Sequence, residues 1–227
     1  MPSGQPLSDP AAAKRLLATA DAVCLDVDST VSPDEGIDVL AAMAGVAEQV
    51  ATLTRAAMGG TVKFEDALAQ RLAIIKPTPE LIDKCLTVHP PRLTPGCAEF
   101  VAALRKRGTA VHLVSGGFAP FVLPLAKQLG LDASAVTANR FTYDATGPGF
   151  DLSVPTAKSG GKARALTALQ MKHGYRRMVM IGDGATDMEA KPPAEVFIGF
   201  GGVVTREKVK AGADWFVTSF AELTGAL

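Results

Sequence analysis

The stretch Ala22-Val23-Cys24-Leu25-Asp26-Val27-Asp28-Ser29-Thr30 decides the fold of this chain. An apolar run that leads into a polar turn predicts a buried parallel strand, here over 22–27, and open α/β sheets bind ligands beyond the carboxyl ends of such strands. Side chains alternate along a strand, so Asp26 and Asp28 project from the same side. Two close carboxylates repel each other unless a cation or a shared proton relieves the repulsion. The pair is therefore a candidate Mg²⁺ site in which one carboxylate attacks and the other moves a proton. The alternative is an ordinary loop in which Asp28 or Ser29 caps the next helix.

The composition is that of an ordinary globular protein. The chain has 227 residues, of which 48% are hydrophobic and 20% charged, enough for one large domain or a core with a small second domain. Its 23 basic and 23 acidic residues balance, which argues against a nucleic-acid partner or an acidic membrane surface. Three cysteines without metal-type spacing favour free thiols in a reducing compartment, and no secretory signal is visible, so we expect a cytoplasmic protein. Glycines and prolines interrupt the uncharged stretch 108–126, so no membrane span is expected. The sequence does not decide whether the protein forms a homodimer.

Helical periodicity fills the chain soon after the first strand, from residue 37 to residue 88, with no convincing strand. Four helices are predicted there, at 37–44, 46–58, 62–75 and 79–86. An insert of this length is too long for a simple crossover, and its position places it over the strand ends like a lid. We therefore predict a helical extension over 1–20, an α/β core formed by 21–36 and 89–227, and a small helical cap over 37–88 inserted after the first strand.

The rest of the chain alternates between strands and helices. Strands are predicted at 110–114, 136–140, 177–181, 195–198 and 215–218, helices at 10–20, 94–106, 118–129, 162–172 and 186–190, and a hairpin over 140–152. This alternation predicts an α/β fold with a Rossmann-like parallel sheet and right-handed crossovers.

Three further signals share the side of the sheet on which Asp26 and Asp28 lie. A second strand ends in Ser115, which Gly116 and Gly117 follow. A third ends in Asp183, with Asp187 one helical turn on. Lys162 follows a Gly-Gly pair at a predicted helix start, where backbone N–H groups favour anions.

These residue types suit phosphoryl transfer. Asp26 is ionised at neutral pH and needs no base to act as a nucleophile, while Asp28 can protonate the leaving oxygen and then activate water. Mg²⁺ held by Asp26 and Asp183 would offset the repulsion between nucleophile and phosphate, and Lys162, Ser115 and the backbone N–H groups of 116 and 117 would hold the phosphoryl oxygens. Phosphate-monoester hydrolysis needs up to ~10²¹-fold acceleration, whereas one general acid supplies about 10²–10⁴-fold. The metal, nucleophile, acid and anion clamp are therefore needed together.

Competing motifs are weaker. Ser159-Gly160-Gly161-Lys162 resembles the end of a phosphate-binding P-loop, but Thr156 stands where that loop has its first glycine. Gly199-Phe200-Gly201-Gly202 lacks the third glycine of a dinucleotide-binding fingerprint. The histidines are scattered along the chain, which favours structural roles for all three.

The chain resembles the haloacid dehalogenase superfamily of phosphatases in four segments: Asp26-Val27-Asp28-Ser29-Thr30, Ser115-Gly116-Gly117-Phe118, Lys162 and Gly182-Asp183-Gly184-Ala185-Thr186-Asp187. It is similar to the phosphoserine phosphatase family within it, especially the eukaryotic form, in Asp34-Glu35-Gly36-Ile37-Asp38, Arg55-Ala56-Ala57-Met58-Gly59-Gly60, Ser159-Gly160-Gly161-Lys162 and Met188-Glu189-Ala190. The likeness runs from about Val23 to the C-terminus.

The resemblance implies hydrolysis of O-phospho-L-serine to L-serine and phosphate, the last step of serine biosynthesis, with Mg²⁺ as cofactor. It implies that Asp26 is the phosphorylated nucleophile, that Asp28 is the acid and base, and that Mg²⁺ is bound by the Asp26 and Asp183 side chains and the Asp28 carbonyl. Ser115 and Lys162 would bind phosphate, and Asp187 would support the metal waters or Lys162. The substrate-binding set that it implies comprises Glu35, Met58, Gly59, Phe64, Arg71, Ser115, Gly116, Gly117, Lys162 and Thr186, with Arg206 assisting nearby.

The sequence of the cap favours an amino-acid substrate. Phe64, Leu68, Arg71, Leu72 and Ile75 fall on one helical face, so Arg71 shares a face with apolar residues. It is either an arginine whose stem covers apolar surface or a bidentate clamp on a substrate carboxylate.

Other residues near the insert have two interpretations each. Glu35 is either a solvated loop residue or the partner of the substrate ammonium. Met58 and Phe64 either pack inside the cap or close the site against water.

Two other functions remain open. The same chemistry would serve phosphothreonine, a phosphohomoserine or a sugar phosphate, because one methylene in a pocket contributes only about 1–3 kcal/mol. A phospho-ligand sensor that binds without turnover is disfavoured by the complete set of nucleophile, acid and metal ligands.

Overall fold

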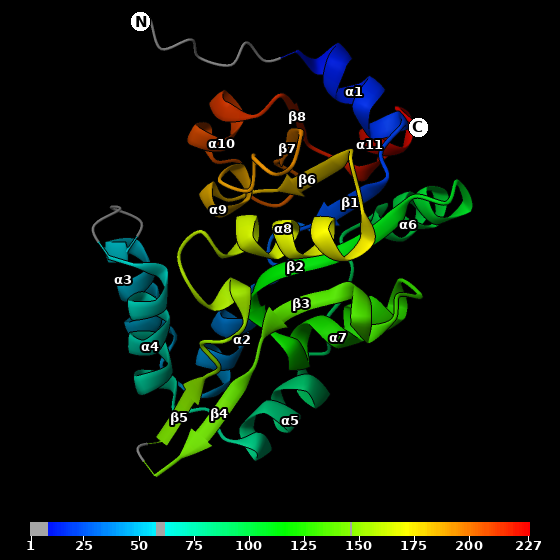
Figure 1. The fold of residues 1–227 in the computed structure, drawn as a ribbon. Coiled ribbons are helices and arrows are strands. Elements are labelled where there is room, and N and C mark those ends of the chain that lie inside the picture. The colour runs from blue at the N-terminus through cyan, green and yellow to red at the C-terminus, as the bar shows by residue number, and fades with distance from the viewer. Residues whose placement is uncertain (1–8, 58–61, 146) are drawn as a thin grey trace, which may run out of the picture.

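The computed structural model describes residues 9–57, 62–145 and 147–227, and its centre is one six-stranded sheet (Figure 1). The strand order is β3-β2-β1-β6-β7-β8, and every neighbouring pair is parallel. The strands are β1 (Ala22–Leu25), β2 (Ala110–Phe118), β3 (Val136–Asn139), β6 (Met178–Gly182), β7 (Val196–Phe200) and β8 (Trp215–Val217). The predicted α/β class with a Rossmann-like parallel sheet is confirmed.

β1 lies in the middle of the sheet because its side chains are apolar on both faces. All four of its residues are fully buried, and β2 and β6 flank it with Ala22 opposite Ala110 and Met178. Val23 and Leu25 join the apolar cluster on one face of the sheet, while Ala22 and Cys24 join the cluster on the other. This alternation is the two-residue period of an extended strand with both faces covered by helices.

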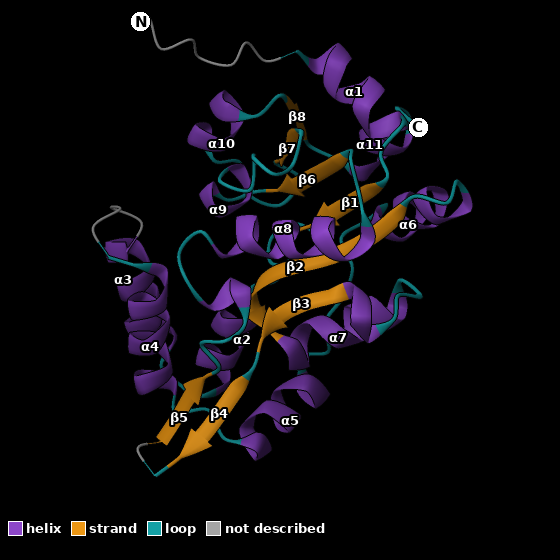
Figure 2. Ribbon diagram, in the orientation of Figure 1, coloured by secondary structure: helices purple, strands orange, loops and turns teal. Residues whose placement is uncertain are grey.

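Helices cover both faces of the sheet (Figure 2). They are α1 (Pro10–Ala18), α6 (Cys97–Lys106), α7 (Ala119–Gln128), α8 (Gly161–His173), α9 (Ala185–Met188), α10 (Glu207–Gly212) and α11 (Phe220–Thr224). Phe100 of α6, Phe200 of β7 and Phe220 of α11 fill one layer, and Leu166 of α8 packs with Met180 and Phe197 in the other. The sequence did not predict α10 and α11, which have six and five residues and are too short to show a clear helical period.

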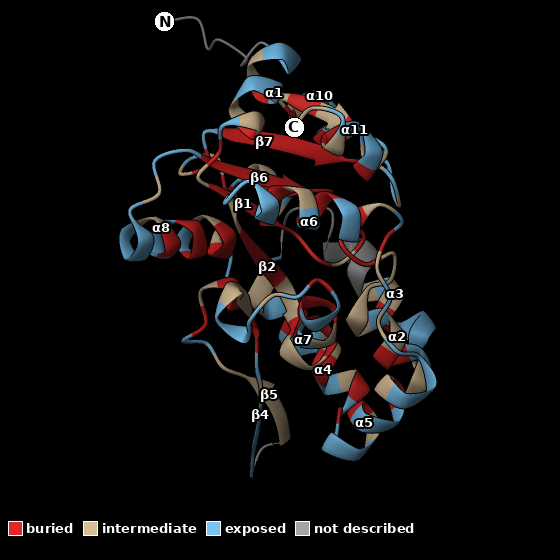
Figure 3. Ribbon diagram, turned by 90° about the vertical axis from the view of Figure 1, so that its right-hand side faces the viewer, coloured by how far each residue is buried: buried red, intermediate tan, exposed pale blue. Residues whose placement is uncertain are grey.

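The four helices predicted for the insert after β1 all form. They are α2 (Gly36–Met43), α3 (Ala47–Ala57), α4 (Phe64–Ile75) and α5 (Pro79–Val88), and we call them the cap. Leu40, Leu68 and Leu72 lie in its apolar cluster, and the side chain of Thr78 caps α5 by accepting from the Leu81 N–H. Figure 3 shows that buried residues line the interior of the cap as well as the sheet. The domain boundaries at 36/37 and 88/89 stay a prediction.

The predicted hairpin forms from β4 (Phe141–Asp144) and β5 (Gly147–Phe150), which pair antiparallel. Phe141 and Phe150 pack against the apolar cluster of the cap, and the ring of Phe141 stacks on Phe118 at a centroid distance of 3.8 Å. The hairpin therefore supports the cap, although it follows the core strand β3 in the chain.

Of the strand ends that differ from the sequence prediction, those of β1 and β2 bear on the site. β1 ends at Leu25 rather than Val27, although the Asp26 N–H still donates to the Ile181 carbonyl at 2.9 Å. The chain then turns, and Ser29 adopts a left-handed conformation with φ of 55°. β2 continues to Phe118, and its register against β3 shifts between Val114 and Phe118. Among the described residues, no helix combines the length and apolar character that crossing a bilayer requires.

Candidate functional site

The carboxyl ends of three adjacent strands converge on one site. Asp26 follows β1, Ser115 lies near the end of β2, and Asp183 follows β6. Since these strands are neighbours in the parallel sheet, their ends meet at one edge. The three residues are at most 6% exposed, so the fold holds polar groups out of water at this edge.

Lys162 is the cation at the centre of the site. Its Nζ lies 2.6 Å from Asp26 Oδ1 and 2.5 Å from Asp187 Oδ1, and its side chain is 7% exposed. Burial opposes its charge, but Asp187 and Asp26 together outweigh burial and raise the pKa of Lys162. Lys162 therefore stays charged and joins the first strand tip to α9.

The turn before Lys162 depends on glycine. Gly160 has a φ of 70°, in the left-handed region that favours glycine. A Cβ at Gly161 would lie 2.4 Å from the Pro155 carbonyl oxygen. The Gly-Gly pair thus allows the chain to pack closely and start α8 with Lys162 directed at the carboxylates.

Asp28 faces β2 and the start of the cap. Its Oδ1 accepts from the Gly36 N–H at 2.8 Å, and its Oδ2 accepts from the Ser115 hydroxyl at 3.3 Å. A Cβ at Gly117 would lie 2.6 Å from Asp28 Oδ2, so any larger residue there would displace this carboxylate. Burial, together with the nearby charge of Asp26, raises the pKa of Asp28 to about 7. A carboxyl group with that pKa is suited to proton transfer near neutral pH.

Asp183 and Arg206 form the far wall of the site. Arg206 Nε donates to Asp183 Oδ2 at 3.0 Å, and the Thr30 hydroxyl donates to Asp183 Oδ1 at 3.3 Å. The second end of the Arg206 guanidinium lies 3.6 Å from Glu35 Oε1, which also accepts from the Ser29 hydroxyl at 3.2 Å. Burial and the charge of Asp26 raise the pKa of Asp183, and Arg206 opposes that rise. Arg206 thus links Asp183 to Glu35.

Asp187 is the most deeply buried carboxylate of the site, with no exposed surface. Besides Lys162, it accepts from the Gly184 N–H at 2.9 Å. A Cβ at Gly182 would lie 2.2 Å from Asp187 Cγ, which explains the glycine at the end of β6. Burial raises the pKa of Asp187, and Lys162 opposes this rise.

The site carries more negative than positive groups. Asp26, Asp28, Asp183 and Asp187 face two cations, Lys162 and Arg206. Oxygens of Asp26, Asp183 and Asp187 lie within 4.8 Å of one another. Hard oxygen donors with uncompensated charge fit a divalent cation. The sequence had assigned metal binding to Asp26, Asp28 and Asp183, and the structure adds Asp187 to the cluster.

Burial changes the expectation for Asp26 itself. The sequence suggested that this carboxylate ionises unaided, but burial and the charge of Asp187 raise its pKa to about 7, against the effect of Lys162. A cation beside Asp26 would favour the ionised form. The ionisation of Asp26 would thus be coupled to cation binding.

The cap contributes Phe64 and Arg71 from the same helix. A Cβ at Gly116 would lie 3.1 Å from Phe64 Cζ, so the ring of Phe64 covers the backbone of β2. Arg71 is half-buried and its Nε donates to the Ala67 carbonyl of its own helix at 3.2 Å. Burial lowers the pKa of Arg71, and the carboxylates of Asp38, Glu35 and Asp28 oppose this. The guanidinium therefore lies in the electric field of the site.

Three predicted residues are less informative. Thr186 is half-buried on α9, next to Asp187 in the chain. Met58 and Gly59 lie outside the described residues.

Asn139 and Thr156 were missed by the sequence analysis. Asn139 is fully buried at the end of β3; its Nδ2 donates to the Gly116 carbonyl at 2.8 Å, and its Oδ1 accepts from the Thr156 hydroxyl at 2.9 Å. This network holds the backbone of β2 where the register shifts. The sequence signal that could have identified Asn139 was its polar side chain near the end of the strand predicted at 136–140.

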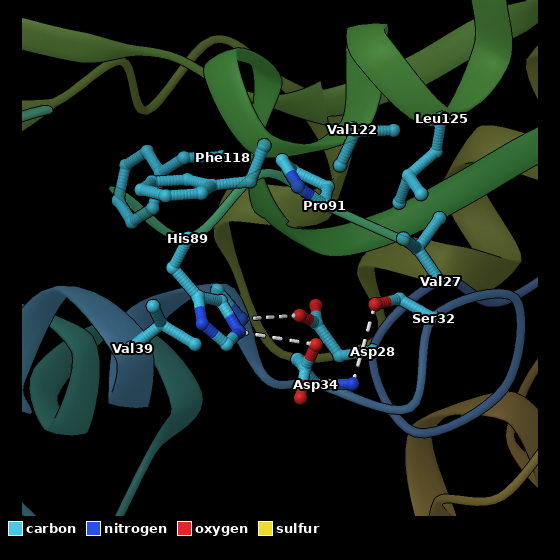
Figure 4. Close-up of a pocket in the computed structure, with 12 residues that line it drawn as sticks. Val27, Asp28, Ser32, Asp34, Val39, His89, Pro91, Phe118, Val122 and Leu125 are labelled. Carbon is cyan, nitrogen blue, oxygen red and sulfur yellow. Dashed lines mark hydrogen bonds and ion pairs between the residues drawn. The ribbon is translucent and has the colours of Figure 1, made fainter. Parts of the chain in front are cut away.

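A small cavity lies behind Asp28, at the two connections between core and cap (Figure 4). Its volume of about 20 Å³ is room for one water molecule. Asp34 in the first connection lies 3.3 Å from His89 Nε2 and 3.1 Å from Arg92 Nε in the second. The two connections are thus tied to each other beside Asp28.

Known proteins resemble this chain in sequence and fold. Residues 20–190 match the haloacid dehalogenase-like hydrolases. Phosphoserine phosphatase of Bos taurus is 50% identical over 216 residues, which cover 94% of this chain and 96% of that relative.

Solved structures extend this likeness to the fold. The DsGPDH structure of Dunaliella salina matches with a TM-score of 0.82 and 38% identity over 94% of this chain, which spans 37% of that longer chain. A phospho-aspartyl intermediate analogue of phosphoserine phosphatase matches with a TM-score of 0.75 and 30% identity, over 88% of this chain and 94% of its own length.

Proposed function

The chain belongs to the haloacid dehalogenase-like hydrolases, and from this premise we propose that it hydrolyses O-phospho-L-serine to L-serine and phosphate. The observation that carries the proposal is the buried bridge in which Lys162 lies 2.6 Å from Asp26 and 2.5 Å from Asp187. It combines a candidate nucleophile with a cation suited to phosphoryl oxygens. The curated relative of Bos taurus, at 50% identity, carries the name of this activity.

In the first step, Asp26 attacks phosphorus and the bond between phosphorus and the serine oxygen breaks. The product is an aspartyl phosphate, and the serine oxygen takes the proton of Asp28. Lys162, the Ser115 hydroxyl and the Gly117 N–H hold the phosphoryl oxygens as charge moves among them. For this, the Ser115 hydroxyl leaves Asp28 and the Gly117 N–H leaves the Ser115 oxygen to which it donates at 2.8 Å.

In the second step, Asp28 is ionised and accepts a proton from water. The water oxygen bonds to phosphorus, the bond to Asp26 breaks, and inorganic phosphate leaves. The pKa of about 7 for Asp28 allows both roles at neutral pH. The Gly36 N–H holds this carboxylate in place throughout.

Asp26 and Asp183 would hold Mg²⁺, with Asp187 close by, as the oxygen donors and the excess negative charge suggest. The ion supplies electrostatic stabilisation of the phosphoryl group and favours ionised Asp26. Arg206 donates to Asp183 in this structure and would compete with the ion for that carboxylate.

Two side chains are suited to the amino-acid part of the substrate. Arg71 lies in the field of Asp28 and Glu35, and we assign it the substrate carboxylate. Glu35 would take the ammonium, in place of its 3.6 Å contact with Arg206. The ring of Phe64 over Gly116 would exclude water from the phosphoryl group. With this substrate, the reaction would complete serine biosynthesis in the cytoplasm.

The test is phosphate release from phosphoserine with Mg²⁺ and with EDTA. We expect activity only with Mg²⁺, and loss of activity in Asp26→Asn. Asp132→Asn makes the same chemical change at an exposed position and should match the unaltered protein. Equal rates with Mg²⁺ and EDTA would refute the metal role, and tight binding without release would establish a sensor instead.

A substrate panel tests the assignment of Arg71. Arg71→Ala should lower kcat/KM for phosphoserine by about 10–100-fold, the loss of a hydrogen-bonded charge pair, and leave a sugar phosphate unaffected. Equal losses for both substrates would contradict the carboxylate clamp.

A further inference from the structure

Glu65 joins the cap to the turn that precedes Lys162. It lies in the first turn of α4, next to Phe64. Its Oε2 accepts from the Ser159 N–H at 2.9 Å and from the Ser159 hydroxyl at 3.0 Å. The same Ser159 oxygen accepts from the Phe64 N–H at 3.1 Å. Three hydrogen bonds thus connect one end of α4 to one residue of the core.

These bonds satisfy groups on both sides. The Phe64 N–H is among the first N–H groups of α4, which have no partner inside the helix. Lys63, at the N-cap position of α4, accepts no hydrogen bond with its side chain. Ser159 of the core therefore supplies the missing acceptor. In return, the Ser159 N–H and hydroxyl hold the pKa of Glu65 below its ordinary value.

The turn that receives Glu65 is fixed from its other side by Arg164. Its guanidinium donates to the carbonyl oxygens of Ser159 at 2.8 Å and of Pro155 and Lys158 at 3.2 Å each. Two residues separate Ser159 from Lys162 in the chain. Core residues alone therefore hold the turn that contains Ser159, and this turn gives α4 a fixed surface on which to pack (Figure 1).

We propose that Glu65 is a latch that holds the cap closed by docking α4 on Ser159, and that it sets substrate affinity as a positioning residue. Closure places Phe64 against Gly116, where its ring covers the backbone of the phosphoryl-binding strand. Substrate entry and product release require this cover to move, so the three hydrogen bonds break and re-form in each cycle. The inference rests on the proposed function only for its kinetic readout.

The kinetic test compares Glu65→Ala with Asp66→Ala. Asp66 is the other acidic residue in the first turn of α4 and is exposed, so its removal makes the same charge change at the same helix end. Loss of the latch weakens closure over bound substrate without moving Asp26 or Lys162. We expect KM to rise about tenfold, the equivalent of one charge-assisted hydrogen bond, with kcat within about twofold. Asp66→Ala should resemble the unaltered protein.

Conservative variants separate a latch from a general defect. Glu65→Gln keeps an acceptor oxygen and should retain most of the substrate affinity. Ser159→Ala keeps the N–H but loses the hydroxyl, so its KM should lie between those of the unaltered protein and Glu65→Ala. The double change Glu65→Ala with Ser159→Ala should cost less than the sum of the single changes, because both remove the same contact. A fall in kcat with unchanged KM would overturn the latch, as would an additive double change.

Amide hydrogen exchange gives a readout that needs no substrate. In Glu65→Ala, the amides of Phe64 and Ser159 should exchange about tenfold faster, and in Asp66→Ala they should not. If phosphoserine is not hydrolysed but this difference appears, the proposed function fails and the latch stands. If phosphoserine is hydrolysed but neither KM nor exchange changes in Glu65→Ala, the latch is wrong.

Discussion

Replacing Asp187 with asparagine tests the buried charge network of the site. Asp187 is fully buried and uses one oxygen for Lys162, at 2.5 Å, and the other for the Gly184 N–H, at 2.9 Å. Asparagine has nearly the same shape but only one oxygen. Its NH₂ group must face either the Lys162 ammonium or the Gly184 N–H, and both of these are donors.

The free-energy cost follows from this loss. A hydrogen bond to a charged group contributes about 1.5–3 kcal/mol, and a buried donor without an acceptor costs about 1–3 kcal/mol. These contributions overlap, so we expect Asp187→Asn to lower the free energy of unfolding by about 3 kcal/mol. For a chain of this size, that corresponds to a fall in Tm of about 6–12 °C.

The assay is thermal unfolding followed by circular dichroism, with Glu189→Gln as the control. Glu189 is exposed at the end of α9, so the same change of carboxylate to amide there should leave Tm nearly unchanged. A second readout is the pH profile. Since the charge of Asp187 helps to raise the pKa of Asp26, its removal should move the acid limb of kcat/KM to lower pH. A Tm within about 2 °C of the unaltered protein, or an acid limb that moves to higher pH, would show that Asp187 does not hold Lys162 and Asp26 in this way.

Other predictions concern residues outside this bridge. Burial lowers the pKa of His112 from 6.5 to about 4; the unfolded chain therefore takes up a proton first as pH falls. Stability should drop between pH 6.5 and 4 by up to about 3 kcal/mol, and His112→Phe should flatten that slope in urea titrations at several pH values. Gly117→Ala places a Cβ 2.6 Å from Asp28 Oδ2, so kcat should fall about 100-fold while circular dichroism stays native; unaltered kinetics would show that the carboxylate can move aside. Asn139→Ala leaves the Gly116 carbonyl without its donor, so kcat should fall while KM changes little. A rise in KM without a fall in kcat would instead indicate that the contact between Gly116 and Phe64 of the cap is lost.

Local sequence patterns predicted the core of the fold well. The buried strand β1, the four helices of the cap and the hairpin were all visible, because each has a strong apolar period or a clear turn. The short helices α10 and α11 were missed, since five or six residues give no reliable period. The continuation of β2 to Phe118 was missed because the Gly116-Gly117 pair suggested a turn.

The candidate site was predictable in its members but not in its electrostatics. Strand ends and glycine pairs identified Asp26, Ser115, Lys162 and Asp183 from local sequence alone. Burial depends on the whole fold, so the raised pKa values of Asp26 and Asp28 could not be predicted. The sequence did place Asp187 near Asp183 and Lys162, but the approach of its oxygen to within 4.8 Å of those of Asp26 and Asp183 appeared only in the folded chain. For the same reason, the contacts of Asn139 and Glu65 with distant segments appeared only in the folded chain.

In the proposed reaction, Asp26 carries the phosphoryl group during hydrolysis of phosphoserine. The most direct measurement is a rapid acid quench of the enzyme with phosphoserine and Mg²⁺, followed by mass spectrometry of the peptide that contains Asp26. We predict a mass increment of one phosphoryl group on Asp26, absent with EDTA and in Asp26→Asn. Phosphate release without any phosphorylated Asp26, or with the increment on another residue, would contradict the account.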